Sequence, residues 1–140
     1  MIKSRGFTLI ELLVVVAIIG ILATFLMVNF IGVRQRGRDS QRKSDLKQLQ
    51  NALELYRSDN SAYPASLSAC GSSFTGPGNA VYMQKIPCDP LGGSYTYAQT
   101  NGVTYSLIAC LENLNDPQKD ATNVAPCNGS TNTSITVRNP

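Results

Sequence analysis

The chain begins with a short basic segment that is followed by a long, uninterrupted apolar run. Residues 7–28 contain one ionisable side chain, Glu11, and Lys3 and Arg5 precede the run. At about 1.5 Å per residue, a helix of this length spans about 33 Å, which is enough to cross a hydrocarbon core of about 30 Å. The pattern therefore predicts a transmembrane helix over residues 7–28.

An apolar run near an N-terminus also occurs in secretory signal peptides, which are cleaved off. This run is longer than the apolar part of a typical signal peptide, about 7–15 residues, and no small-residue cleavage site follows it. We therefore favour a retained anchor over a cleaved signal. Lys3 and Arg5 place the start of the chain in the cytoplasm and the remainder outside, although the cations within residues 34–47 count toward the opposite orientation.

Glu11 is the unusual residue of the apolar run. A carboxylate at the centre of a bilayer costs about 2.5–3.5 kcal/mol, and an ionisable side chain in a membrane segment is by default a candidate functional site. Such a carboxylate needs a cationic partner. We expect this partner to be the amine of a newly formed N-terminus.

The helical pattern continues beyond the apolar run. No proline occurs before Pro64, and we expect one helix of about 50 residues, which is long for a globular domain. Its second half, residues 29–62, is amphipathic and should pack on a compact domain. The apolar stripe recurs at spacings of three and four residues: Leu46, Leu49, Leu53 and Tyr56.

Six cations lie within residues 34–47, and two spacings there allow ion pairs along the helix, Asp39 with Lys43 and Arg42 with Asp45. We expect these pairs on the exposed face. The favoured interpretation of the cluster is a solvated or lipid-headgroup-facing surface, with contacts to other subunits as an alternative. Nucleic acid is disfavoured because no aromatic residue interleaves the cations.

From Ser58 onward the composition shifts to Gly, Ser, Thr, Asn, Pro and Tyr, which predicts a small, loop-rich domain. Two β-prone runs meet at an Asn-Gly pair, residues 101–102, which is typical of a two-residue hairpin turn. That turn would place Ala98 opposite Tyr105. It would also put Val103, Tyr105 and Leu107 on the face that covers the helix.

Four cysteines, Cys70, Cys88, Cys110 and Cys127, all lie in this C-terminal region. An even number of cysteines in an exported, loop-rich domain indicates two disulfides and supports the orientation with this domain outside the cytoplasm. Three pairings are possible. We favour Cys70–Cys88 and Cys110–Cys127 because each closes a local loop. A zinc site is disfavoured because the chain has no histidine and no Cys-x-x-Cys spacing.

The absence of histidine also removes the common nucleophilic triads, and no phosphate-binding loop is present, so an enzyme is not expected. No cofactor is expected either. One loop is rich in oxygen ligands and could hold calcium, but it lacks EF-hand spacing, so a solvated acidic loop is favoured. The residues concerned are Glu112, Asn113, Asn115, Asp116 and Asp120.

Residues 5–13, Arg-Gly-Phe-Thr-Leu-Ile-Glu-Leu-Leu, resemble the prepilin cleavage and methylation motif of type IV pilins and pseudopilins. The resemblance implies that a membrane prepilin peptidase cuts between Gly6 and Phe7 and that the new amine of Phe7 is N-methylated. It also implies that Glu11 recognises the Phe7 amine of a neighbouring subunit and so sets the register between subunits.

Two further stretches, residues 55–64 and 86–95, resemble segments of the major pseudopilin of type II secretion. The chain departs from that family in three ways. The calcium loop of that family cannot be matched residue by residue to residues 112–120, so no calcium ligands are assigned from the resemblance. Val28 stands where the family has a helix-bending proline, and the major pseudopilin is not normally disulfide-bonded. A disulfide near the C-terminus is instead a trait of pilins.

The residues and the resemblance together predict an α+β, pilin-like fold, in which a long N-terminal helix packs on a small antiparallel sheet that contains disulfides. Residues 134–138 are expected to add an edge strand to this sheet. Four segments are expected: a leader peptide (1–6), a transmembrane and filament-core helix (7–28), its amphipathic continuation (29–62) and a β-rich globular head (63–140).

The resemblance implies a structural subunit of a type IV pilus-like or type II secretion pseudopilus filament. The implied partners are further copies of the chain, other pilins or pseudopilins, the prepilin peptidase and methyltransferase, an inner-membrane assembly platform, and membrane lipid before assembly. The implied location is the bacterial inner membrane, then a periplasmic or extracellular filament. The alternatives are a minor pilin in surface adhesion or DNA uptake, and a lone membrane-anchored domain.

Overall fold

The computed structural model describes residues 6–139, without the side chains of residues 26–29. The expected leader peptide, residues 1–6, therefore lies outside the described residues apart from Gly6, and so does the side chain of Val28. The chain divides into two compact units, Met1–Arg34 and Gln35–Pro140.

A single long helix, α1, spans Leu9–Asn60 and contains 52 residues. It confirms the long helix expected from the periodicity and from the absence of proline. At its C-terminal end, the backbone N–H of Ser61 donates to the carbonyl of Arg57 at 2.8 Å, and Ser61 has a positive φ of 61°. A residue in the left-handed region directly after a helix is a common way to end it.

The head, within Gln35–Pro140, carries two small antiparallel sheets. The first pairs β1 (Phe74–Thr75) with β2 (Val81–Met83), and a 3-10 turn, η1 (Pro77–Asn79), joins them. The second has the order β3-β4-β5. Its strands are β3 (Thr96–Thr100), β4 (Thr104–Leu111) and β5 (Thr133–Arg138). The last is the expected edge strand, and it begins at Thr133.

The hairpin between β3 and β4 exists, but its expected register was wrong by one residue. Tyr105 pairs with Gln99 and not with Ala98, because Val103 joins Asn101 and Gly102 in the loop. Asn101 and Gly102 both have positive φ, as the Asn-Gly pair predicts, and the N–H of Val103 closes the turn on the carbonyl of Thr100. Val103 is consequently 57% exposed and does not cover the helix.

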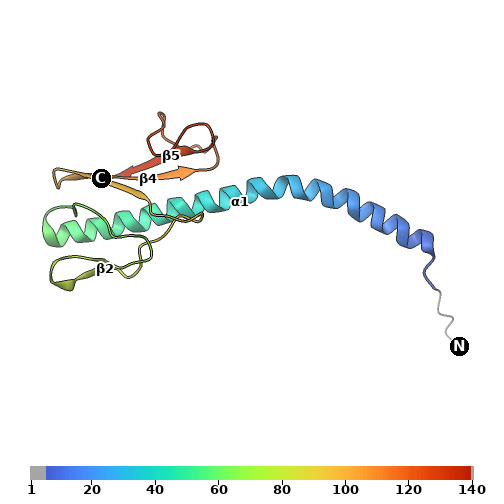
Figure 1. Cartoon of the computed structure of the whole chain (residues 1–140), viewed down its shortest axis with the longest axis horizontal. Helices are drawn as coiled ribbons and strands as arrows, with labels where there is room; N and C mark the ends of the chain where they lie inside the picture. The colour runs from blue at the N-terminus through green and yellow to red at the C-terminus, as the bar shows by residue number, and fades with distance from the viewer. Residues whose placement is uncertain (1–5, 140) are drawn as a thin grey trace. The chain divides into compact units, whose positions relative to one another are not determined.

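The core of the head lies between the apolar stripe of α1 and the inner faces of the strands. Figure 1 shows the C-terminal part of α1 running between β4 and β5 on one side and the segment that carries β2 on the other. The stripe residues Leu46, Leu49 and Leu53 are at most 1% exposed. Burial of such a side chain contributes about 1.5–3 kcal/mol. From the strands, Phe74, Tyr105, Leu107 and Ala109 join the same cluster.

Two disulfides hold the loops of the head. They join Cys70 to Cys88 and Cys110 to Cys127, the pairing that closes local loops. The second ties β4 to the long connection before β5, and Cys127 is itself buried. Each cross-link restricts the unfolded chain, which suits a head with a small core.

Candidate functional site

The start of α1 is held by a reciprocal contact between Thr8 and Glu11. The backbone N–H of Thr8 donates to Oε2 of Glu11 at 2.8 Å, and the Thr8 hydroxyl donates to the same oxygen at 2.7 Å. The N–H of Glu11 donates to the Thr8 hydroxyl at 3.3 Å. This arrangement is a capping box, which satisfies N–H groups that the first helical turn leaves without partners. Glu11 therefore fixes where the helix begins.

The second carboxylate oxygen of Glu11 has room for another donor. Within the described residues, Oε1 of Glu11 accepts no hydrogen bond. The side chain lies on an open groove of about 330 Å³, which is otherwise lined by Phe7, Ile10, Val14 and Val15. An ammonium group that approached along this groove would meet one partly satisfied carboxylate in apolar surroundings. Once lipid or protein covers the groove, the local dielectric falls and the attraction between the two charges becomes strong.

The N-terminal half of α1 exposes its apolar side chains on all sides. In the single chain, every large apolar residue within 7–25 is at least 46% exposed, and Phe30, Ile31 and Val33 are exposed as well. Soluble monomers rarely expose contiguous apolar patches beyond a few hundred Å². This surface therefore requires a cover of lipid or of other apolar protein.

Within the described residues, no single helix has both the length and the apolar composition that a membrane span requires. The segments Leu9–Phe25 and Phe30–Asn60 meet this requirement together, as a pair joined at a bend.

The expectation that the cations of residues 34–47 form a solvated surface was wrong for three of them. Arg38, Arg42 and Lys43 all point to carboxylates of the head rather than to solvent. Arg38 forms a two-pronged ion pair with Glu112, at 2.6 and 2.5 Å. Lys43 binds both oxygens of Asp116 at 2.7 Å.

Arg42 is the centre of this cluster and is 2% exposed. Its Nε and Nη2 bind the two oxygens of Asp89 at 2.6 and 2.9 Å, and its Nη1 binds Asp39 and Glu112 at 2.8 Å each. The expected pairs Asp39–Lys43 and Arg42–Asp45 do not form. Asp45 instead accepts a hydrogen bond from the Tyr95 hydroxyl at 2.7 Å.

The ion pairs shift the titration of the groups involved. Burial works against the charge of Arg42, but hydrogen bonds to Asp89, Glu112 and Asp39 outweigh it and raise the pKa of Arg42. The ion pair with Arg38 lowers the pKa of Glu112 to about 2, against burial and with help from Arg42. These charges stay fixed at neutral pH, so the cluster is a permanent connection between α1 and the head loops.

The oxygen-rich loop does not present a calcium site. Glu112 is held by Arg38 and Arg42, and Asp116 by Lys43. Asp120 accepts hydrogen bonds from the hydroxyls of Ser134 and Thr136 at 2.5 and 2.7 Å. Calcium needs about six to eight oxygens around one point. Among the described residues, no group of three acidic, cysteine or histidine side chains is placed so that it could hold a metal ion, and the residues of this loop do not fit calcium.

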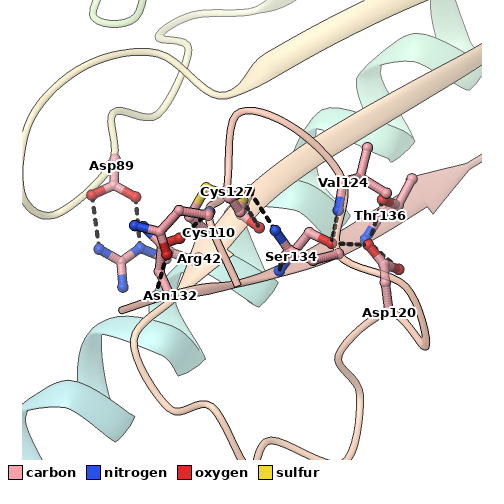
Figure 2. The surroundings of a disulfide bond; sticks show 12 residues. Arg42, Asp89, Cys110, Asp120, Val124, Cys127, Asn132, Ser134 and Thr136 are labelled. Atoms are coloured by element: carbon pink, nitrogen blue, oxygen red, sulfur yellow. Dashed lines mark hydrogen bonds and ion pairs between the residues drawn. A yellow bond between two sulfur atoms is a disulfide. The ribbon is translucent and has the colours of Figure 1, made fainter. Parts of the chain in front are cut away.

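Asp120 has a structural role next to the second disulfide. Figure 2 shows it beside Ser134, which lies on β5 and is fully buried, and beside Thr136. The hydroxyl of Ser134 accepts the backbone N–H of Val124 at 2.9 Å. These bonds tie the loop after β4 to the outer strand and satisfy polar groups that burial would otherwise leave unpaired.

Two features escaped the sequence analysis. The capping role of Glu11 was readable, because Thr8 and Glu11 have the Thr-x-x-Glu spacing of a capping box. The Arg42 cluster had no readable signal, since Asp89 and Glu112 lie 47 and 70 residues further along the chain. Gly6 and Phe7 lie before α1 and are exposed, and the cleavage, methylation and register roles assigned to Gly6, Phe7 and Glu11 stay predictions.

Two family profiles match the chain. One is described as a prokaryotic N-terminal methylation motif and matches residues 1–27. The other is described as type II secretion system (T2SS), protein G, and matches residues 29–121. The two profiles meet close to the end of the apolar run.

Similar curated proteins carry the same name. The type II secretion system core protein G of Vibrio cholerae is 37% identical over 103 residues, covering 68% of this chain and 70% of that protein. The protein of that name from Escherichia coli is 34% identical, covering 66% and 70%. The one from Pseudomonas aeruginosa is 36% identical, covering 68% and 73%. No solved structure matches the chain significantly.

Proposed function

Because this chain belongs to the type II secretion system protein G family, we propose that it is a structural subunit of a pseudopilus, the filament of such a secretion system. The matching N-terminal methylation motif supports this role. The contrast between an exposed apolar helix and a compact, disulfide-bonded head supports it as well. A structural role of this kind needs no catalytic group, and we propose no enzymatic activity.

The observation that carries the proposal is the apolar surface of α1 before Arg34. A helix that is apolar on all sides is stable in lipid or among other apolar helices. Before assembly the inner membrane would cover it. In the filament the same segments of neighbouring copies would cover one another, so the subunit exchanges lipid contacts for protein contacts at little cost in apolar burial.

Glu11 would select the position of the neighbouring subunit. In the part of the chain that the structure describes, Oε2 of Glu11 caps α1 and Oε1 accepts no hydrogen bond, so Oε1 would be left for the amine of Phe7 from another copy. Burial of a charge pair often contributes little net stability, because desolvation opposes the attraction. An unpaired carboxylate in the same place would be strongly unfavourable. The main effect of Glu11 is therefore to disfavour alignments of neighbouring subunits in which its carboxylate has no amine partner.

The amine of Phe7 exists only after cleavage. We propose that a prepilin peptidase cuts between Gly6 and Phe7 and methylates the new amine, and that an inner-membrane platform extracts the processed subunit. The head would then lie on the periplasmic side. A side chain at Gly6 would meet no described atom within 4 Å, so a substitution there tests recognition by the peptidase and not folding.

The experiment expresses the full chain with its assembly system and measures sedimentable filaments. Glu11→Ala and Glu11→Gln should insert in the membrane, and filament yield should fall by about tenfold or more, which corresponds to 1.4 kcal/mol. Lys47→Ala, an exposed change on the second half of α1, is the matched control and should assemble normally. Gly6→Asp should leave a precursor whose mass still includes residues 1–6.

Normal filament yield from Glu11→Ala would refute the register role and leave the filament role standing. Absence of any filament from the unaltered chain, with its assembly system present and the subunit processed, would refute the filament role itself.

A further inference from the structure

The strongest feature outside the N-terminal segment is the cluster around Arg42. One buried guanidinium meets three carboxylates from three separate segments: Asp39 from α1, Asp89 from the loop after the first disulfide, and Glu112 from the end of β4. Figure 2 shows Asp89 facing Arg42 with two parallel contacts. A cation that gathers carboxylates from distant segments is an arrangement usually seen around a bound metal ion.

The carboxylates around Arg42 are also held by other donors. Asp39 accepts the backbone N–H groups of Glu112 and Asn113, at 2.9 and 2.8 Å. Asp89 accepts the backbone N–H of Leu91 at 2.8 Å. No described side-chain polar atom that is fully buried lacks a hydrogen-bond partner. The cluster is therefore saturated by donors of the chain itself.

We propose that Arg42 is a resident cation that holds the head loops in the way a bound divalent ion would, so that the head is stable without calcium. The loop of residues 112–120 has the composition of a calcium loop, yet Arg38, Arg42 and Lys43 take up its first two carboxylates. Two covalent links lie beside the same segments, since Cys88 precedes Asp89 and Cys110 is near Glu112. The proposal does not depend on the filament role.

The charges explain why calcium would not replace the arginine. Glu112 bridges Arg38 and Arg42, so a calcium ion there would face two guanidinium groups at close range and would be repelled. An arginine also presents its donors in a fixed fork that matches carboxylates, and it cannot lose its charge in a protein. A covalently attached cation has no dissociation equilibrium, so the contact persists at any calcium concentration.

The first test is thermal unfolding of the full chain in detergent micelles, followed by circular dichroism, with millimolar EDTA and with millimolar calcium. We expect the same Tm in both. A calcium site filled at about 100 times its Kd would raise Tm by about 10–20 °C. A rise of that size, or a matching fall with EDTA, would overturn the proposal.

The second test alters the cation. Arg42→Gln removes the cation shared by the buried Asp39 and the part-buried Asp89 and Glu112, and it should lower Tm by at least about 10 °C. Arg42→Lys keeps the positive charge but loses the forked set of guanidinium donors, so its Tm should lie between those of Arg42→Gln and the unaltered protein. Arg36→Gln, an exposed change on the same helix, is the matched control and should stay within about 3 °C of the unaltered protein. Equal Tm values for Arg42→Gln and the control would overturn the proposal. The calcium test decides it even if Arg42→Gln fails to fold.

Discussion

Glu112 offers a quantitative test of the ion cluster, because its titration differs between the folded and unfolded chain. In the folded protein, hydrogen bonds from Arg38 lower the pKa of Glu112 from 4.5 to about 2. A carboxyl group with a lowered pKa stabilises the fold above its unfolded pKa, and this stability is lost as the pH falls through the folded value. The loss should therefore occur between about pH 5 and pH 2.

The magnitude follows from the same two pKa values. One pKa unit corresponds to 1.36 kcal/mol, so the fall of the Glu112 pKa from 4.5 to about 2 amounts to about 3 kcal/mol. About 2 kcal/mol of this is lost between pH 7 and pH 3. The Glu112 side chain is 16% exposed, so solvent screening reduces this loss only modestly.

The assay compares urea unfolding of the full chain and of Glu112→Gln, in micelles, at pH 7 and pH 3. Although burial opposes it, ion pairs with Arg42 and Lys43 also lower the pKa values of Asp89 and Asp116. Both proteins should therefore lose stability in acid. The contribution of Glu112 is therefore given by the difference in free energy of unfolding between the two proteins at each pH.

At pH 7 the free energy of unfolding of Glu112→Gln should be lower than that of the unaltered protein. This difference should be about 2 kcal/mol smaller at pH 3. A gap of the same size at both pH values would refute the assignment of the acid-sensitive stability to Glu112.

Three further changes test the head. Leu107→Ala empties a site that is fully buried and should reduce the free energy of unfolding by about 2–5 kcal/mol in urea titrations. Gly102→Ala puts a Cβ on a residue with a φ of 70° and should lower the free energy of unfolding by about 1–2 kcal/mol. An unchanged midpoint of the urea titration would contradict this expectation. Replacing Cys110 and Cys127 by serine should lower the free energy of unfolding by about 2–4 kcal/mol. In the unaltered protein, alkylation without prior reduction should add no mass, because the four cysteines are in disulfides.

The helix and its core stripe were predictable because they depend on local spacing. An apolar run with no proline, followed by leucines at helical intervals, specifies an element whose contacts repeat every turn. The disulfide pairing was one of three possibilities, and local loop closure pointed to the one that the structure has. The fold class followed from these elements and from the resemblance of residues 5–13.

The register of the hairpin and the charge cluster were not predictable in the same way. An Asn-Gly pair indicates a turn, but whether Val103 joins the loop depends on how Tyr105 and Leu107 meet the helix. A shift of one residue in the pairing places the other set of β3 side chains beside Tyr105 and Leu107, which themselves stay on the face toward the helix. Arg42 was interpreted as a surface cation because its nearest acidic residues in sequence are Asp39 and Asp45. Its other partners come from loops that only the folded head brings near.

The central claim is that Glu11 meets the amine of Phe7 from a neighbouring copy inside a filament. Imaging of the isolated filament at a resolution that shows side chains tests it most directly. We expect the helices of residues 7–28 at the filament centre, with a carboxylate oxygen of Glu11 within hydrogen-bond distance of a neighbouring Phe7 amine. Helices outside the centre, or a Glu11 that contacts no amine of another copy, would contradict the account.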